Sequence, residues 1–129
     1  TLQLGTKSAG CHDVATEVQG ALAQSAGILL KDYAPGTAHI FVAHGTAAIT
    51  VNEKGAQALV DLHTALCSMA PSTLPATTVH MEAHLLTTLV GTSVTVPILA
   101  DGTFGFNRYT TLILCEFRRD KPHARKLVV

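Results

Sequence analysis

Two runs of β-forming residues lie almost end to end in the first half of the chain, and they constrain the fold more than any other feature. Residues 38–43 and 47–51 are rich in apolar and β-branched side chains, and only His44, Gly45 and Thr46 separate them. Short apolar runs bounded by a glycine-containing segment are typical of strands. Other β-type runs predict further strands at residues 2–7, 28–30, 93–98, 111–117 and 126–129.

Stretches with helical periodicity are interspersed among these strands. Apolar residues recur every four positions within residues 12–27, which predicts one buried helical face. Residues 55–69 carry a second apolar face, and residues 80–90 carry mixed helical signals that end at a glycine suited to a C-cap. The order β-α-β-β-α-α-β-β-β predicts an α+β fold, a single compact domain over residues 1–129 with a mainly antiparallel sheet.

Charge is scarce in this sequence. Charged residues make up only 14% of the chain, below the roughly 25% of an average soluble domain. We therefore expect some apolar surface to be buried between subunits, the alternative being an exterior rich in Ala and Thr. The nine acidic and nine basic residues cancel, so no overall field favours nucleic acid or an anionic membrane as a partner.

The sequence also bears on location. No apolar run approaches the eighteen or so residues that span a bilayer, and no charged-then-apolar leader is found. The three cysteines are an odd number without paired spacing, which indicates reduced thiols and not a disulfide framework. We expect a cytoplasmic protein that does not contact a membrane.

Polar residues that end the two central strands are the first candidates for a site. His44 closes the first strand and precedes Gly45, where a buried strand opens into a loop. Its alternative role is a hydrogen bond to a local backbone group. Asn52 and Glu53 follow the second strand, and their alternative role is to cap the next helix and occupy its first turn.

Three further residues could carry chemistry. Glu116 shares a strand face with apolar residues, so if that face is interior the carboxylate must be paired, metal-bound or protonated. His80 and His84 lie one helical turn apart and could point into one cleft, although the zinc-protease helix motif is absent. The alternative for this pair is exposed or hydrogen-bonded imidazoles.

Several segments together resemble the YjbQ-like family. Residues 39–53 end in His-Gly-Thr-Ala-Ala-Ile-Thr-Val-Asn-Glu and are similar to the most characteristic stretch of that family, where a strand ends in a His and the next in an Asn-Glu pair. The resemblance covers nearly the whole chain. The other matching segments, in family order, are residues 10–18, Asp61, residues 83–98, residues 115–117 and Arg125.

The resemblance implies a compact α+β fold that assembles as a homotrimer, with sites near subunit interfaces. Some members resemble thiamine phosphate synthases, which join a pyrimidine diphosphate to a thiazole phosphate and release diphosphate. It thus implies a phosphorylated small-molecule substrate. Carried over position by position, His44 and His84 are metal ligands for a divalent ion or acid–base groups, Glu53 and Glu116 are acidic partners, and Asn52 is an orienting residue.

The chain departs from the family pattern at positions that matter for phosphate chemistry. Gly45 stands where Thr is usual, Leu86 stands where a Lys is usual, and residues 107–110 replace a Gly-Thr-Trp-Gln signature. Because a diphosphate leaving group needs cations or a metal, the stabilisation would come from a divalent ion or from Arg108, Arg118 or Arg125. Two hypotheses follow: a metal-assisted transferase, and an oligomeric protein that binds a metal or small ligand without turnover.

Overall fold

Antiparallel pairing joins every strand of this protein. A computed structural model describes residues 1–129 and contains three α-helices, one short 3-10 helix and two sheets. The strands are β1 (Leu2–Gln3), β2 (Gly10–Asp13), β3 (Gly36–Val42), β4 (Ala47–Glu53), β5 (Ser93–Ile98), β6 (Thr110–Glu116) and β7 (Lys126–Val128). The helices are α1 (Ala15–Ala26), α2 (Ala56–Ser68) and α3 (Met81–Val90), and the 3-10 helix is Leu30–Tyr33. The predicted α+β fold is confirmed.

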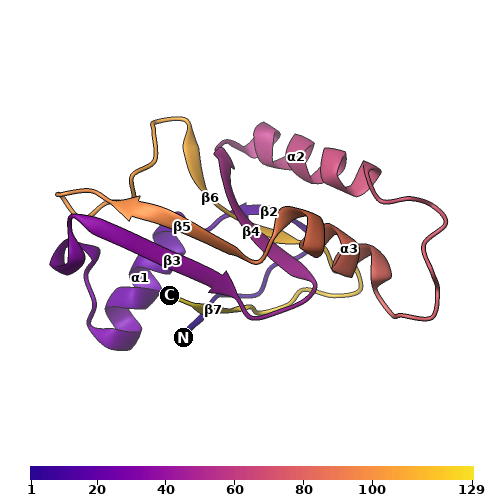
Figure 1. Cartoon of the computed structure of the whole chain (residues 1–129), viewed down its shortest axis with the longest axis horizontal. Coiled ribbons are helices and arrows are strands. Elements are labelled where there is room, and N and C mark those ends of the chain that lie inside the picture. Colours follow the sequence, from indigo (N-terminus) through magenta and orange to yellow (C-terminus); the bar gives the residue numbers. More distant parts are fainter.

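The two central strands belong to different sheets. The four-stranded sheet has the order β1-β7-β3-β5, and the three-stranded sheet has the order β2-β6-β4 (Figure 1). Residues 44–46 therefore carry the chain from one sheet to the other. This crossing places His44 at the junction of the two sheets.

The main core lies between the sheets and α1. Its members come from both sheets, as alternation along β3 shows, where Ala38, Ile40 and Val42 point inward and their neighbours are exposed. Val18 and Leu22 add the buried face of α1. Each such side chain, fully buried, contributes about 1.5–3 kcal/mol relative to exposure, so this shared core holds the sheets together.

A second, smaller core covers the other face of the three-stranded sheet. It consists of Cys11, Ala48, Ala83, Leu86, Ile113, Cys115 and Phe117, with partly buried side chains of α2 packed against it. β6 is therefore covered on both faces and is buried along almost its whole length. A polar side chain on β6 must find its partner inside the protein.

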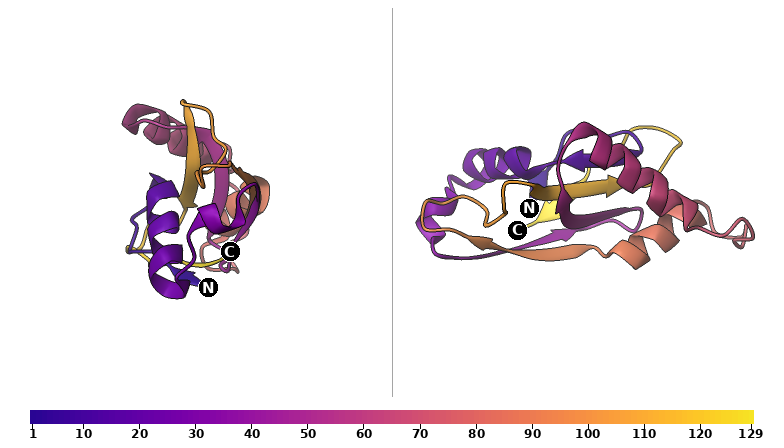
Figure 2. Two further views of the ribbon diagram at one scale, coloured as in Figure 1. Left: turned by 90° about the vertical axis from the view of Figure 1, so that its left-hand side faces the viewer. Right: turned by 90° about the horizontal axis from the view of Figure 1, so that it is seen from above.

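Helix α2 is the least buried helix. None of its residues is fully buried, although it packs against β2. Figures 1 and 2 show α1 at one end of the molecule and α2 with α3 at the other. Val60 on α2 is 59% exposed, and Val79 and Leu89 at α3 are also largely exposed. This end of the molecule carries apolar surface that one chain leaves uncovered.

Two N-terminal predictions are wrong. The strand expected at residues 2–7 is paired only at Leu2–Gln3, apart from an isolated bridge at Lys7. The helix expected from residue 12 begins at Ala15, because Gly10–Asp13 instead pair along β6. Pairing with a buried strand outweighs the local helical pattern, since it satisfies the backbone and buries Cys11.

A third prediction is also wrong. The strand expected at residues 28–30 is absent, and the chain there enters the 3-10 helix Leu30–Tyr33. Leu30 is buried there and belongs to the main core, which explains the apolar run without a strand.

The three α-helices are too short or too polar for any of them to span a membrane.

Candidate functional site

The loop from β3 to β4 is fastened to β7. The backbone N–H of Lys126 donates to Nε2 of His44 at 2.9 Å, and the N–H of Ala43 donates to the carbonyl of Lys126 at 3.1 Å. The alternative role of His44, a hydrogen bond to a backbone group, is therefore present. Since Nε2 accepts this bond, the neutral ring carries its proton on Nδ1.

The surroundings of His44 favour the neutral ring. Burial lowers the pKa of His44, and the positive charge of Arg125 lowers it further, against an opposing effect of Glu116. A neutral imidazole with Nε2 occupied can donate from Nδ1 but has no free lone pair for a metal. His44 in this arrangement suits hydrogen bonding to a ligand and not metal ligation.

His84 lies against the same loop. It is on α3, and a Cβ placed on Gly45 would lie 3.2 Å from its Nδ1 and 3.3 Å from its Cε1. That spacing is tighter than ordinary van der Waals contact, so the glycine lets the imidazole approach the backbone. The departure from the family Thr at position 45 thus has a structural counterpart: a side chain there would displace His84.

A polar hollow of about 410 Å³ opens beside His84. Its lining residues are glycines, threonines and the histidine itself: Gly45, His84, Thr87, Thr88, Gly91 and Thr92. Thr87 is only 3% exposed, and its hydroxyl Oγ1 has no hydrogen-bond partner. A buried hydroxyl without a partner is costly, which makes this hollow the best candidate for a polar ligand.

Sequence reasoning missed these threonines. Thr87 and Thr88 follow His84 at spacings of three and four, which places them on the same face of a helix. That spacing was the available signal. His80, in contrast, does not extend this face, because it precedes the first turn of α3 as the N-cap residue, with a left-handed φ of 59°.

Glu116 serves the interior of the protein. It is fully buried, and its two carboxylate oxygens accept from Nε and Nη2 of Arg125, each at 2.5 Å. Nη2 of Arg125 also donates to Oγ1 of Thr46 at 2.9 Å, and the N–H of Arg118 donates to Glu116 at 3.0 Å. A buried carboxylate can be paired, metal-bound or protonated, and Glu116 is paired. Through Arg125 this ion pair also holds Thr46 of the β3–β4 loop in place.

Asn52 and Glu53 lie at the far end of β4. Oδ1 of Asn52 accepts from the N–H of Glu53 at 2.8 Å, and both residues line an exposed hollow of about 420 Å³ that also contains Asp61. The alternative that Asn52 caps the next helix is wrong, since the N-cap of α2 is Gly55. Asn52 is five residue steps along the strand from Ala47, which corresponds to about 17 Å at 3.4 Å per residue.

The candidate residues therefore form two groups. His44 and His84 lie at the start of β4, whereas Asn52 and Glu53 lie at its end. No three His, Cys, Asp or Glu side chains of one chain are placed to hold a metal ion together. The divalent site expected from the resemblance at His44 and His84 stays a prediction.

The arginines expected to replace the family Lys are already engaged. Arg108 lies over the ring of Tyr109, with its guanidinium carbon 4.6 Å from the ring centroid. Arg118 forms an ion pair with Asp120 at 2.6 Å, and Arg125 forms one with Glu116. Arg119, which was not among the expected arginines, pairs with Glu82 at 3.0 Å. Only the arginines in exposed ion pairs could exchange their carboxylate partner for a phosphate at low cost, because surface ion pairs contribute about 0–1 kcal/mol.

Leu86 occupies an interior position. It is 1% exposed and belongs to the second core, on the side of α3 that faces the three-stranded sheet. A lysine with the same orientation would bury its ammonium group in an apolar cluster. The change from Lys to Leu therefore removes a cation from α3 and adds to the core.

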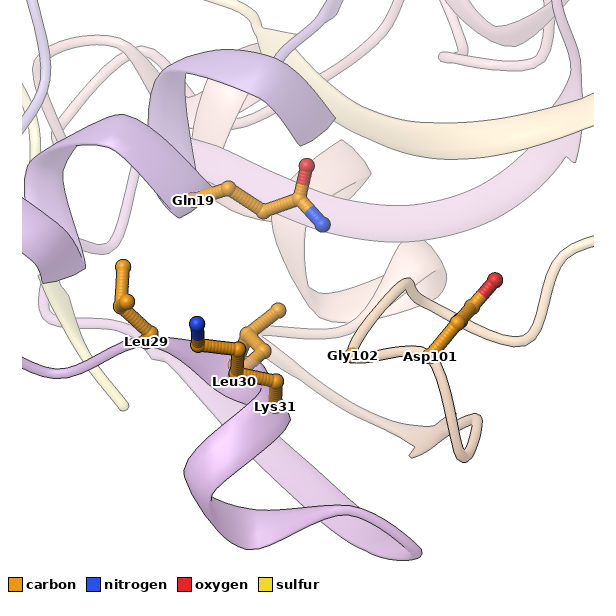
Figure 3. Close-up of a pocket in the computed structure, with 6 residues that line it drawn as sticks. All are labelled: Gln19, Leu29, Leu30, Lys31, Asp101 and Gly102. Carbon is orange, nitrogen blue, oxygen red and sulfur yellow. The ribbon is translucent and has the colours of Figure 1, made fainter.

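A further hollow lies near the opposite end of the molecule and contains none of the expected residues. It has a volume of about 270 Å³, and Figure 3 shows Gln19 reaching toward it from α1. Its floor is close-packed, since a Cβ on Gly102 would lie 2.6 Å from the backbone of Lys31. The remaining lining residues are Leu29, Leu30 and Asp101.

Fold and site define a small α+β protein with two antiparallel sheets and a polar hollow where the sheets meet. A sequence model of the family described as "UPF0047 protein YjbQ-like" matches residues 1–129. The chain belongs to this family. No curated protein matches the sequence.

Solved structures support the same assignment of fold. A YjbQ/UPF0047-family protein from Clostridium acetobutylicum, described as uncharacterised and as an ortholog of a Bacillus subtilis protein, has a TM-score of 0.74 at 22% identity, covering 98% of this chain and 95% of its own. A conserved hypothetical protein from Thermus thermophilus has a TM-score of 0.71 at 22% identity, covering 100% and 99%. A protein of unknown function from Sulfolobus solfataricus has a TM-score of 0.70 at 22% identity, covering 98% and 91%.

Proposed function

We propose that this protein is a cytoplasmic homotrimer that binds a phosphorylated heterocycle and acts as a thiamine-phosphate-synthase-like transferase, joining a pyrimidine diphosphate to a thiazole phosphate. The observation that carries this proposal is the polar hollow beside His84, which is lined in part by Thr87, a residue whose buried hydroxyl has no hydrogen-bond partner. A hollow of about 410 Å³ is within the usual range for small-molecule sites.

The division of the candidate residues supports a site shared between subunits. The His44 and Glu53 ends of β4 are too far apart for one small substrate to contact both in the same chain. In a homotrimer, the far end of β4 from one subunit can approach the His84 hollow of the next. The exposed apolar side chains Val60, Val79 and Leu89 provide surface that such contacts would bury.

Within the hollow, hydroxyl groups and imidazoles would carry the recognition. Thr87, Thr88 and His84 line the hollow and offer hydroxyl and ring-nitrogen atoms for these contacts. In this proposal a divalent ion serves as the counter-ion of the diphosphate. The chain's own residues would bind and orient the phosphorylated compound and exclude water from it.

A second candidate, a binding protein without turnover, has a specific observation in its favour. Leu86 is buried where the family Lys is expected, and no cationic side chain lines the His84 hollow. Loss of one contact to a developing charge typically costs a hundred- to thousandfold in rate, about 2.7–4 kcal/mol. Binding of a neutral or weakly charged ligand would not suffer this loss.

One experiment separates the two candidates. Purified protein with Mg²⁺ or Mn²⁺ is incubated with the pyrimidine diphosphate and the thiazole phosphate, and thiamine phosphate and released diphosphate are both measured. The transferase requires equal amounts of both products, lost in His84→Ala and retained in His39→Ala, a matched control on the exposed face of β3. Calorimetric binding of either substrate without products would establish the binding protein.

A further variant tests the hollow itself. Thr87→Val keeps the shape of the side chain and removes only the hydroxyl that has no internal partner. The proposal requires weaker ligand binding without any loss of stability. Unchanged binding in Thr87→Val and in His84→Ala would refute the hollow as the binding site.

A further inference from the structure

Two cysteines face each other inside the second core. Cys11 on β2 and Cys115 on β6 are direct antiparallel partners, and their sulfur atoms are 3.6 Å apart. The N–H of Val14 donates to the carbonyl of Leu112 in the same ladder, which makes that pair a hydrogen-bonded one. Because hydrogen-bonded and non-hydrogen-bonded pairs alternate, Cys11 and Cys115 form a non-hydrogen-bonded pair.

This position suits a disulfide. In a non-hydrogen-bonded pair the Cα atoms are about 4.5 Å apart, which lies within the usual disulfide range of roughly 4.4–6.8 Å. The sulfur atoms need to approach by about 1.5 Å to reach a bond length of about 2.05 Å, a movement available to side-chain rotation. The strands themselves need not move apart or change register.

A groove leads to one of the two thiols. Cys11 lies in its wall together with His12, Leu59, His63 and Thr64, and the groove has a volume of about 340 Å³ between β2 and α2. Cys11 is 9% exposed, whereas Cys115 is fully buried behind it. A reagent that enters the groove therefore meets Cys11 first, and Cys115 can respond only through Cys11.

The two thiols differ in acidity. Contact with Cys115 lowers the pKa of Cys11, because the Cys115 S–H can donate to the Cys11 thiolate. The same contact and the burial of Cys115 raise the pKa of the latter, so it keeps its proton. Burial also lowers the pKa of His63, whose imidazole lines the same groove.

We propose that Cys11 and Cys115 form a peroxide-reactive dithiol site, in which Cys11 is oxidised first and Cys115 resolves it. The Cys11 thiolate attacks one oxygen of a hydroperoxide, the O–O bond breaks, and the leaving oxygen takes up a proton as water or an alcohol. The sulfur of Cys115 then attacks the Cys11 sulfenic acid, and hydroxide leaves with the Cys115 proton as water. The two thiols supply the two electrons that reduce the peroxide, and a cross-strand disulfide remains.

A small hydroperoxide fits better than a bulky disulfide oxidant. Only the edge of Cys11 is reachable, and attack on a disulfide requires access for a mixed intermediate at the sulfur. Cys67 provides the internal comparison. It is half-buried on α2, 3.6 Å from Nε2 of His63, and has no cysteine opposite it.

The test uses the full chain and hydrogen peroxide. Native, reduced protein receives stoichiometric peroxide, free thiols are then alkylated, and the intact mass and disulfide-linked peptides are determined. We expect loss of two hydrogen atoms, a Cys11–Cys115 link, and faster formation than in urea-unfolded protein. Reversal by dithiothreitol should restore both thiols.

Variants assign the order of events. Cys115→Ala should stop at a sulfenic acid on Cys11 that dimedone traps, Cys11→Ala should leave Cys115 unmodified, and Cys67→Ala should change neither result. A link that involves Cys67, or no faster reaction in the native than in the unfolded wild-type protein, would overturn the proposal. Because the rate comparison needs no variant, the proposal stays testable even where a substitution prevents folding.

Discussion

The buried pair of Glu116 and Arg125 offers the sharpest test of how the site is supported. Both side chains are almost completely buried, with exposures of 0% and 3%. Arg125→Met leaves the carboxylate with one remaining donor, the N–H of Arg118. Removal of one partner from a buried ion pair costs about 3–5 kcal/mol, because an uncompensated charge stays in the interior. We expect Tm to fall by roughly 10–20 °C.

The double variant Glu116→Leu with Arg125→Met should be more stable than either single variant. It leaves no buried charge, and only two groups lose a bond, the hydroxyl of Thr46 and the N–H of Arg118. At about 1 kcal/mol for each, the double variant should cost about 2 kcal/mol. A coupling of several kcal/mol between the two positions follows.

Urea denaturation followed by circular dichroism measures these differences, at one fixed protein concentration because the proposed assembly would add to the apparent stability. Arg118→Met is the matched control, since its ion pair with Asp120 is partly exposed and should contribute about 0–1 kcal/mol. A loss below about 1 kcal/mol for Arg125→Met, or a double variant less stable than both single ones, would refute the reasoning. A folded double variant that still binds ligand would identify Glu116 as a supporting residue and not a catalytic one.

Four further outcomes follow from other parts of the structure. Folding lowers the pKa of His44 below its ordinary value of 6.5, so the unfolded chain binds more protons than the folded one as the pH falls, and wild-type stability should decrease between about pH 7 and pH 5. His44→Gln keeps an acceptor near the N–H of Lys126 but cannot titrate. The variant should therefore lose less stability over this pH range in urea titrations. Thr87→Val should raise the free energy of unfolding by about 1–3 kcal/mol in urea titrations, since it removes a buried hydroxyl that has no hydrogen-bond partner. Leu86→Lys should destabilise the protein by several kcal/mol, measured in the same way, because it buries an ammonium group in the second core. Closing the disulfide between the two strand cysteines should raise stability by about 2–4 kcal/mol, and dithiothreitol should abolish the gain.

The chemistry of the proposed site depends on segments that are distant in sequence. His44 receives its hydrogen bond from a residue 82 positions later, and Thr46 receives its bond from Arg125, 79 positions later. The C-terminal segment around β7 therefore positions the β3–β4 loop. Substitutions in this segment should change the position of the His44 imidazole, although the substituted residues themselves do not contact a ligand.

Local patterns in the sequence were sufficient for most elements. Helix α2 and strand β5 lie where periodicity predicts them, because one face of each packs on the protein and the other is exposed. The roles of individual site residues were less accessible. The interior position of Glu116 was a stated alternative, but its partner Arg125 is on another strand segment, and no spacing rule links the two.

What the sequence alone determined is the α+β class, most of the elements from β3 onward, the candidates His44, Asn52 and Glu53 at the ends of strands, and the candidate His84 within a helix. Only the tertiary structure decided that β3 and β4 enter different sheets, that residues 10–13 form a strand, and that the candidate residues divide into two groups. The physical reason is the separation along the chain of the residues that interact. Hydrophobic periodicity records which face of an element is buried, whereas strand pairing and buried charge pairing are settled between segments that meet only after the chain has folded.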